Sequence, residues 1–354
     1  MKYFVKEILF FSLFYLGLFD LFLKLLARVC REHPCIILLY HRIVDDNSKY
    51  LNKGAAVHHH IKDFKREITY FKKHFQILSM DQVVNHMKVG KGFKRPSIAI
   101  TFDDGYLDNY TLAYPVLKKH GVPATIYLTT GLVGTPDGIW TEQIGVAFLE
   151  TKKAYFNLSG LLGDETIPIK TKEEKERANR KVSEALKLRP DDERRELMEK
   201  LFEELEVSKK SGRHVGERMM LNWEEVQEMR RDGMTIGSHS HTHPILSQMP
   251  IQRAKDEISN SKKVVENNVD MRVKHFSFPN GREEDFSEEL RDYCRKIGFE
   301  SVCSVVYGPY DASKKDPFAL KRVGAIHPVS TMVGEIVRLF FRCATRRNSG
   351  ASVG

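Results

Sequence analysis

Short apolar runs alternate with amphipathic segments along most of this 354-residue chain. Residues 35–40, 97–102 and 124–129 are apolar runs of the length typical of strands that are buried on both faces. Between these runs, residues 61–75 and 110–120 carry apolar side chains at helical spacing. Strands that alternate with helices in this way predict βαβ units and a parallel sheet.

The same alternation resumes after residue 222. It predicts strands at residues 234–236, 274–278 and 300–304, helices at 254–266 and 288–296, and a last apolar segment at 318–326. Residues 151–213 differ, because they are highly charged and carry Leu197, Leu201 and Leu205 at helical spacing. We interpret them as a helical insertion whose apolar face packs in a core. A lid or a partner surface is the alternative.

The composition, 42% hydrophobic and 29% charged, is that of a folded globular chain and excludes wholesale disorder. The five cysteines are odd in number and form no Cys-x-x-Cys pair, so a disulfide framework or a cysteine zinc site is not expected. The net charge of +9 favours anionic partners such as lipid head groups, although a lysine-rich solvated surface explains it as well. No arginine-rich stripe interleaved with aromatic residues is present, so we expect no nucleic-acid partner.

The N-terminal segment is the most apolar part of the chain. Residues 8–19 carry no charge, but a membrane-spanning helix needs about 20 such residues, and Asp20 and Lys24 interrupt the run. We expect residues 1–33 to form an apolar, amphipathic helix that contacts a membrane surface through residues 3–28 and lies in the interface. A single span and a helix docked on the domain are the alternatives. The protein would then be membrane-associated at the cell envelope, on a side that the sequence does not determine.

Two adjacent carboxylates, Asp103 and Asp104, follow a predicted buried strand, and Gly105 permits a sharp turn after them. In α/β barrels, catalytic groups gather at the carboxyl ends of strands. One carboxylate can bind a metal ion while the other faces the substrate. An ordinary Asp-Asp-Gly turn is the alternative interpretation.

Three histidines follow another predicted strand. His239 and His243 are four residues apart, so in a helical turn both imidazoles would face the same way, whereas His241 would point away. One carboxylate with two imidazoles is a ligand set that leaves metal coordination positions open for water and substrate. A polar loop with surface histidines is the alternative.

Two further motifs follow predicted strands. Pro279-Asn280-Gly281 is either an ordinary turn or a turn whose Asn280 backbone N–H donates to a developing oxyanion. Leu39-Tyr40-His41 places a histidine where it could act as a general acid, although a lone histidine is more often merely hydrogen-bonded.

Together, these motifs resemble the polysaccharide deacetylase family of carbohydrate esterases. The resemblance covers residues 35–326 and rests on Thr101-Phe102-Asp103-Asp104-Gly105 followed by His239 and His243. It implies a distorted parallel (β/α) barrel of about seven strands, which we place at residues 34–341 with the insertion at 151–213. Residues 342–354 are expected to be a flexible basic tail.

The resemblance also implies roles for individual residues. Asp103 matches the general base, and Asp104, His239 and His243 match the metal ligands, usually of zinc. Asn280 matches the oxyanion position. Substrate contacts are expected at three further residues, namely Leu39, Tyr106 and Pro279.

The general acid and its motif depart from the usual family order. Leu39 and His41 match a motif that usually lies near the C-terminus, as in circularly permuted relatives, and His327 competes for the role. The usual arginine ahead of the Pro279 motif is absent, and Arg322 is a candidate to orient the base instead.

The resemblance predicts a metal-dependent hydrolase that removes N-acetyl groups from a polysaccharide or oligosaccharide of N-acetylglucosamine type. A deacylase of a membrane lipid-linked sugar is the alternative within hydrolases. A non-catalytic carbohydrate-binding relative is the alternative from another class.

Overall fold

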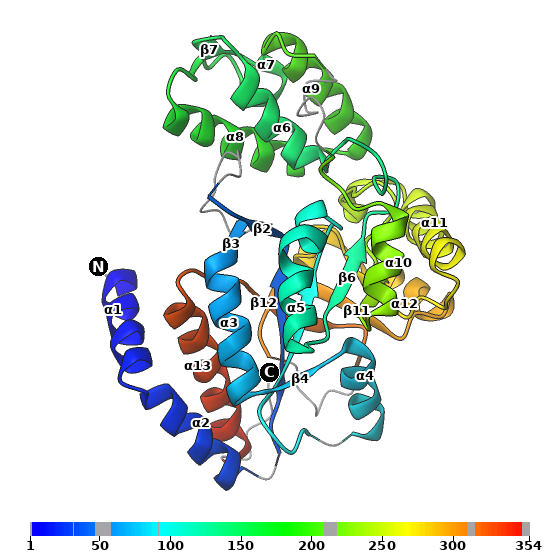
Figure 1. Cartoon of the computed structure of the whole chain (residues 1–354). Helices are drawn as coiled ribbons and strands as arrows, with labels where there is room; N and C mark the ends of the chain where they lie inside the picture. Colours follow the sequence, from blue (N-terminus) through cyan, green and yellow to red (C-terminus); the bar gives the residue numbers. More distant parts are fainter. Residues whose placement is uncertain are drawn as a thin grey trace.

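The computed structural model describes residues 2–30, 32–46, 58–90, 92–208, 218–309 and 316–348. Within these ranges, seven parallel strands close into a barrel, because β1 pairs with both ends of the series β12-β11-β10-β9-β6-β5 (Figure 1). The predicted parallel barrel of about seven strands is confirmed. Its strands are β1 (Cys35–Tyr40), β5 (Ser97–Phe102), β6 (Thr125–Leu128), β9 (Thr235–Ser238), β10 (His275–Ser277), β11 (Ser301–Tyr307) and β12 (Leu320–Gly324).

Strands β1 and β5 form the most regular part of the barrel. All their residues are buried, as expected for apolar runs that are covered on both faces. On its other edge, β5 pairs first with β4 (Gln76–Leu78) and, nearer its carboxyl end, with β6. The sequence does not reveal β4, because three residues are too few for a periodic pattern.

Helices cover the outside of the barrel. The helix α3 (Ile61–His74) buries Phe64, Ile68 and Phe71, which lie on the apolar face that the sequence predicts. Reciprocal caps fix the starts of two others, with Ser79 before α4 and Asn222 before α10. The helices of this layer besides α3 are α4 (Met80–Val89), α5 (Tyr114–His120), α10 (Trp223–Arg231), α11 (Ile251–Val269), α12 (Glu288–Lys296) and α13 (Val329–Asn348).

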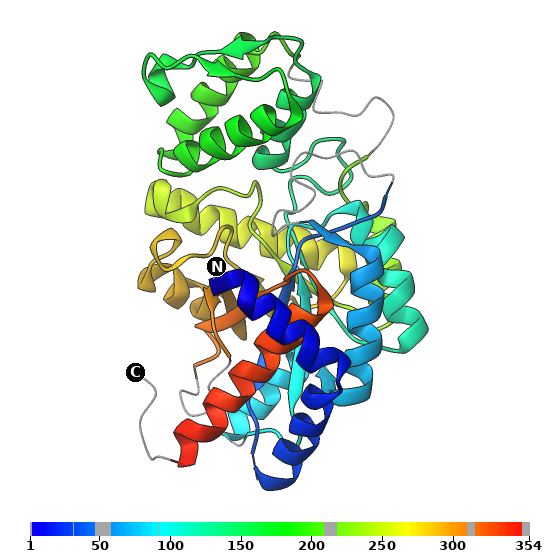
Figure 2. The same cartoon turned by 90° about the vertical axis from the view of Figure 1, so that its left-hand side faces the viewer.

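A helical subdomain stands over one end of the barrel (Figures 1 and 2). Its apolar side chains form a separate core, to which the loop after β9 adds Ile245. The predicted insertion starts at residue 151, but Trp140 and Ile144 already belong to this core. The earlier boundary is not visible in the sequence because the shift to a charged composition comes after α6. The elements are α6 (Trp140–Glu150), β7 (Tyr155–Phe156), α7 (Ser159–Leu162), β8 (Ile167–Pro168), α8 (Lys172–Lys187) and α9 (Asp191–Glu204).

The N-terminal segment forms two helices rather than one. The helices α1 (Lys2–Tyr15) and α2 (Leu18–Val29) meet at Gly17, whose φ of 70° is accessible to glycine without strain. Both pack along α13 on the flank of the barrel (Figure 2), with the Phe10 ring against Gly334. Among the described residues, no single helix is long and apolar enough to cross a membrane, whereas α1 and α2 together pass that test but are bent by 74°.

The C-terminal segment forms the helix α13, which the sequence analysis does not predict. The flexible tail was expected from Arg342, but α13 continues to Asn348, and residues 349–354 lie outside the described part. No proline or glycine occurs between Glu335 and Asn348, and basic residues near a helix C-terminus interact favourably with the helix dipole.

Candidate metal centre and active site

The predicted site residues come from the carboxyl ends of neighbouring parallel strands. Asp103 and Asp104 follow β5, His239 follows β9, and His41 follows β1. Because these strands run in the same direction around one barrel, their carboxyl ends meet at the rim that the helical subdomain covers.

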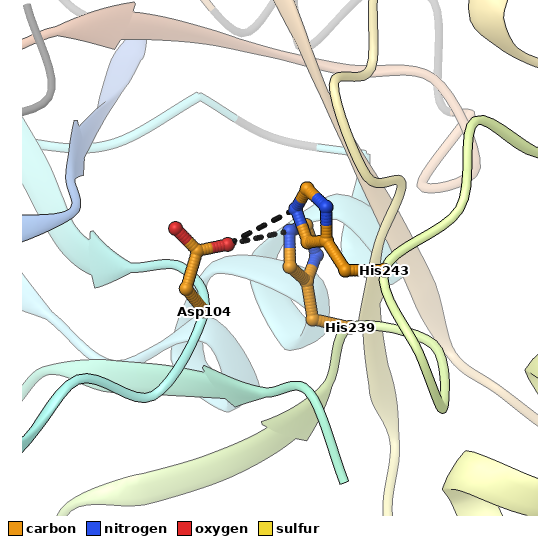
Figure 3. A group of neighbouring side chains, drawn as sticks. All are labelled: Asp104, His239 and His243. Carbon is orange, nitrogen blue, oxygen red and sulfur yellow. Dashed lines mark ion pairs between the residues drawn. The ribbon is translucent and has the colours of Figure 1, made fainter. Parts of the chain in front are cut away.

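Asp104, His239 and His243 converge on one point (Figure 3). The Nε2 atoms of His239 and His243 lie 3.3 and 3.2 Å from Oδ1 of Asp104. All three side chains are buried, and one ligand atom from each lies within 4.8 Å of the others. The structure therefore brings together the three residues that the sequence analysis assigned to the metal.

The hydrogen bonding of this group fits a cation. Oδ1 of Asp104 is buried and receives no hydrogen bond from the described residues, although two imidazole nitrogens face it. Nδ1 of His239 lies 2.7 Å from the carbonyl oxygen of Ser277, which leaves Nε2 as the ligand atom. A divalent ion among the three atoms would replace the missing hydrogen bonds, and this donor set suits zinc.

Asp103 is held from behind by Arg322 of β12. The guanidinium donates to both carboxylate oxygens, at 2.7 and 2.6 Å, and both side chains are buried. Ser277 adds a hydrogen bond to Oδ2 of Asp103 at 3.1 Å and accepts one from Arg322 at 2.8 Å. The carboxylate is thus fixed in orientation next to Asp104 and His239.

Opposing effects set the charges in the site. Burial raises the pKa of Asp103, but the Arg322 charge and His239 outweigh burial and hold that pKa below its usual range. Burial likewise raises the pKa of Asp104, and His239 and His243 bring it well below its usual range. Both aspartates are therefore anionic at neutral pH.

Unusual backbone conformations concentrate around this group. Within the described residues, six non-glycine residues have positive φ angles, and four of them are Asp104, Ser240, His243 and Asn280. Such conformations cost about 1–3 kcal/mol each and persist where the surrounding structure enforces them. The helical turn predicted for His239–His243 is wrong. These residues form a loop with left-handed conformations at Ser240 and His243, and the loop brings the two imidazoles together.

The two histidines considered as general acids lie in different places. His41 lines the same cavity as Asp103 and Asp104, and burial lowers its pKa while the two aspartates act in the opposite direction. His327 lies apart from this cavity, stacked on His59 and 3.1 Å from Asp63. The geometry favours His41.

A cavity of about 430 Å³ opens in front of Asp104, His239 and His243. Leu39, Tyr106 and Asn280 line it, as the sequence analysis expected, whereas Pro279 does not. The side-chain nitrogen of Asn280 is buried and makes no hydrogen bond with the described residues.

Known proteins share this sequence pattern. The family model for polysaccharide deacetylase matches residues 90–151 and 207–302, which include the two aspartates and the histidine loop. The chain contains a polysaccharide deacetylase domain. The match is interrupted between residues 151 and 207, where most of the helical subdomain lies.

Solved structures share the fold. The deacetylase PplD of Streptococcus pyogenes, in complex with acetate, aligns with a TM-score of 0.56 at 16% identity, over 87% of this chain and 99% of that one. IcaB from Ammonifex degensii aligns with a TM-score of 0.54 at 15% identity, over 87% and 98%. At these identities the comparison establishes the fold alone.

Relatives of known sequence include the Bacillus subtilis protein YxkH. It is 24% identical over 289 residues, which are 81% of this chain and 70% of YxkH. The poly-beta-1,6-N-acetyl-D-glucosamine N-deacetylase of Staphylococcus aureus (strain MSSA476) is 32% identical over 115 residues, which are 29% of this chain and 39% of the relative.

Sequence reasoning missed several polar residues beside the cavity. Arg42 of β2 (Arg42–Val44) donates to Asp108 at 2.8 Å and stacks on Tyr106, with 4.6 Å from guanidinium carbon to ring centroid. Glu142 of α6 lies 3.4 Å from Arg42 and 3.5 Å from His58 of β3 (His58–His60). In the sequence, only the position of Arg42 directly after His41 could have indicated one of these residues. The other contacts join distant parts of the chain.

Proposed function

We propose that this polysaccharide deacetylase hydrolyses N-acetyl groups of a glycan built on N-acetylglucosamine. The observation that carries the proposal is the buried Asp104–His239–His243 group beside a carboxylate held by Arg322, at the floor of a cavity. Ligands on one side and an oriented base on the other suit the activation of water next to an acyl group. The resemblance to a poly-N-acetylglucosamine deacetylase of Staphylococcus aureus supports the substrate class.

In the proposed reaction, water adds to the acetamido carbonyl carbon, the carbon–nitrogen bond breaks, and acetate and a free amine form. Asp103 accepts the proton of the water, and Arg322 keeps its carboxylate aimed at the site. The backbone N–H of Asn280 is assigned to the carbonyl oxygen as negative charge develops. His41, which lines the same cavity, donates a proton to the leaving nitrogen.

Asp104, His239 and His243 are the proposed ligands of a divalent ion, with zinc as the first candidate. When bound, such an ion polarises a carbonyl oxygen and acidifies water.

Acetate release from N-acetylglucosamine oligomers tests the proposed reaction. We expect release by the zinc-loaded protein, loss on chelation and recovery when zinc is returned. Asp103→Asn should retain zinc and lose turnover. A metal-loaded wild type that releases no acetate, or a fully active Asp103→Asn variant, would refute the assignment.

We further propose that the faces of α1 and α2 turned away from the barrel lie on an anionic membrane surface. Large apolar side chains are exposed along both helices and the turn between them, at Val5, Ile8, Leu9, Phe11, Tyr15, Leu16, Leu18, Leu21 and Leu25. The polar side is docked, because Tyr70 donates to Asp20 at 2.8 Å and Lys6 pairs with Glu335. Exposed Lys24 and Arg28 can pair with anionic head groups.

Vesicle sedimentation tests this orientation with two matched variants. Leu16 and Leu188 are 72% and 76% exposed, but Leu188 belongs to the helical subdomain. Leu16→Lys should weaken binding to phosphatidylglycerol-containing vesicles at least about tenfold, since burying a leucine is worth about 1.5–3 kcal/mol. Leu188→Lys should bind like wild type. Equal binding by all three proteins, or a wild-type dimer that Leu16→Lys dissociates, would overturn the membrane assignment.

If the membrane assignment holds, a lipid-linked amino sugar is the alternative substrate to a free polymer. Acetate release from soluble oligomers and from lipid-linked sugars in vesicles distinguishes the two. If the substrate is a lipid-linked sugar, acetate should be released from the vesicle-bound sugars and not from the soluble oligomers.

A further inference from the structure

The cavity in front of the metal ligands is formed by two parts of the chain. The barrel supplies its floor, including Asp103, Asp104 and His41, whereas α6 and α8 of the helical subdomain supply nearly half of the lining residues. The subdomain packs its own apolar core with one side of these helices and presents another side to the cavity. The apolar side chains of the subdomain thus pack in a core, as the sequence analysis interprets them. A second face of the subdomain lines the cavity.

The face of α8 toward the cavity is polar. Asn179, Arg180, Ser183, Glu184 and Lys187 line the cavity, and their spacing of three or four residues places them on one side of the helix. Ser183 donates to Oδ1 of Asn179 at 3.3 Å. The amide nitrogen of Asn179 makes no hydrogen bond within the described part of the chain, so its donors are available to a ligand.

The cavity side of α6 is polar at Thr141 and Glu142 and apolar farther along the helix. Gly145, Val146 and Leu149 line the cavity there, and a Cβ added at Gly145 would lie 3.6 Å from the amide nitrogen of Asn179. Amide and hydroxyl groups on α8 thus lie beside aliphatic surface on α6, and this combination is suited to a sugar ring, which has hydroxyl groups at its edge and C–H groups on its faces.

Charged contacts connect this side of α6 and α8 to the barrel. Glu142, on α6, lies 3.4 Å from buried Arg42 of the barrel. On the other side, Glu184 of α8 lies 3.5 Å from Arg282, which comes two residues after Asn280. The subdomain is therefore held at the same rim of the barrel as the reacting atoms.

We infer that the cavity-facing sides of α6 and α8 bind the sugar units next to the one that is deacetylated, so that the protein selects oligosaccharides over single amino sugars. The inference rests on the proposed function, because it assumes that an N-acetylated glycan occupies the cavity. Asn179 and Ser183 supply hydrogen bonds to the neighbouring units, and Val146 and Leu149 supply apolar contact.

The inference is tested by equilibrium binding of N-acetylglucosamine oligomers of one to five units, measured by calorimetry. Zinc-loaded Asp103→Asn protein is used so that the oligomers remain intact during the titration. We expect the Kd to fall at least tenfold from one unit to four. The added substitutions Asn179→Ala and Ser183→Ala should raise the Kd for the tetramer about tenfold and that for the single sugar less than twofold.

A control with the same two chemical changes is available at exposed positions outside the cavity. Ser159→Ala and Asn267→Ala together should leave every Kd unchanged. Alanine is a better helix former than asparagine or serine, so the substitutions on α8 should not lower the melting temperature.

The outcomes separate this inference from the proposed reaction. Two results would overturn the inference even if wild type releases acetate. One is a Kd that does not depend on the number of sugar units. The other is an Asn179→Ala/Ser183→Ala protein whose Kd falls with the number of units as much as that of the protein without these two substitutions. Length-dependent binding that needs Asn179 and Ser183, without acetate release by wild type, would support the glycan surface and refute the reaction.

Discussion

Replacing Arg322 by methionine removes the charge that balances Asp103 inside the barrel. Arg322 donates to both oxygens of Asp103, to Ser277 and to the carbonyl oxygen of Ser304, all at 2.6–2.8 Å. Methionine fills similar space but donates nothing, which leaves the carboxylate with the hydroxyl of Ser277 at 3.1 Å. Removing one partner of a buried ion pair costs about 3–5 kcal/mol, and we expect Arg322→Met to lower the free energy of unfolding by that amount.

The second partner allows a double-mutant cycle. Asp103→Asn replaces the carboxylate by an amide of the same shape, so Arg322→Met then leaves no buried charge behind. We expect the double variant to be more stable than the sum of the single changes predicts, by about 1–3 kcal/mol of coupling energy. Arg322→Lys keeps the positive charge without the planar fork and should recover part of the loss.

Urea unfolding at pH 7, in the presence of a chelator, measures these differences without a contribution from bound metal. A cost below about 1 kcal/mol for Arg322→Met would refute the balancing role, given the penalty for an uncompensated buried charge. The balancing role would also be refuted if the stability change of the double variant equals the sum of the two single changes to within about 0.5 kcal/mol, which is the limit for independent sites.

Three further predictions concern separate features. Asp104→Ala removes the carboxylate ligand, so zinc uptake measured by elemental analysis should fall from one ion per chain to none, and full occupancy would contradict the ligand assignment. Asn280 has a φ of 60°, so Asn280→Ala should cost about 1 kcal/mol in thermal unfolding and Asn280→Gly less, whereas equal losses would argue against backbone strain. His275 and Lys274 hold the pKa of Asp81 below its usual range, so this carboxylate stabilises the fold above its unfolded pKa of about 3.9 and loses that effect as the pH falls toward the lower folded pKa. Asp81→Asn should therefore cost up to about 1 kcal/mol at pH 7 and less at pH 3, and a urea midpoint difference that grows on acidification would contradict this sign.

The residues that sequence analysis found share one property, which is that local sequence positions them. Asp103 and Asp104 directly follow an apolar strand, and His239 directly follows another, so the parallel barrel alone predicts that they meet. The loop geometry that brings in His243 was beyond reach, because a left-handed residue such as Ser240 has no signal in a single sequence.

The contacts that complete the site depend on the closure of the barrel. Arg322 lies 219 residues after Asp103 in the chain, and the family motif that usually supplies this arginine is absent here. Glu142 was missed for the same reason, since its partner Arg42 lies 100 residues away. Nothing local distinguishes either residue from a solvated charge, and only the folded barrel places them beside the site.

The position of the helical subdomain follows from the strand order. Strand β6 pairs directly with β9, so the chain between them leaves from the carboxyl end of β6 and must return to the amino end of β9. Whatever is inserted at that exit stands above the rim where the metal ligands lie, because the carboxyl ends of all the parallel strands share one rim. The α10 helix comes after the subdomain in the chain and connects it to β9. An insertion after β6 can therefore change which molecules reach Asp104 and His239 without altering the strands that position these two residues.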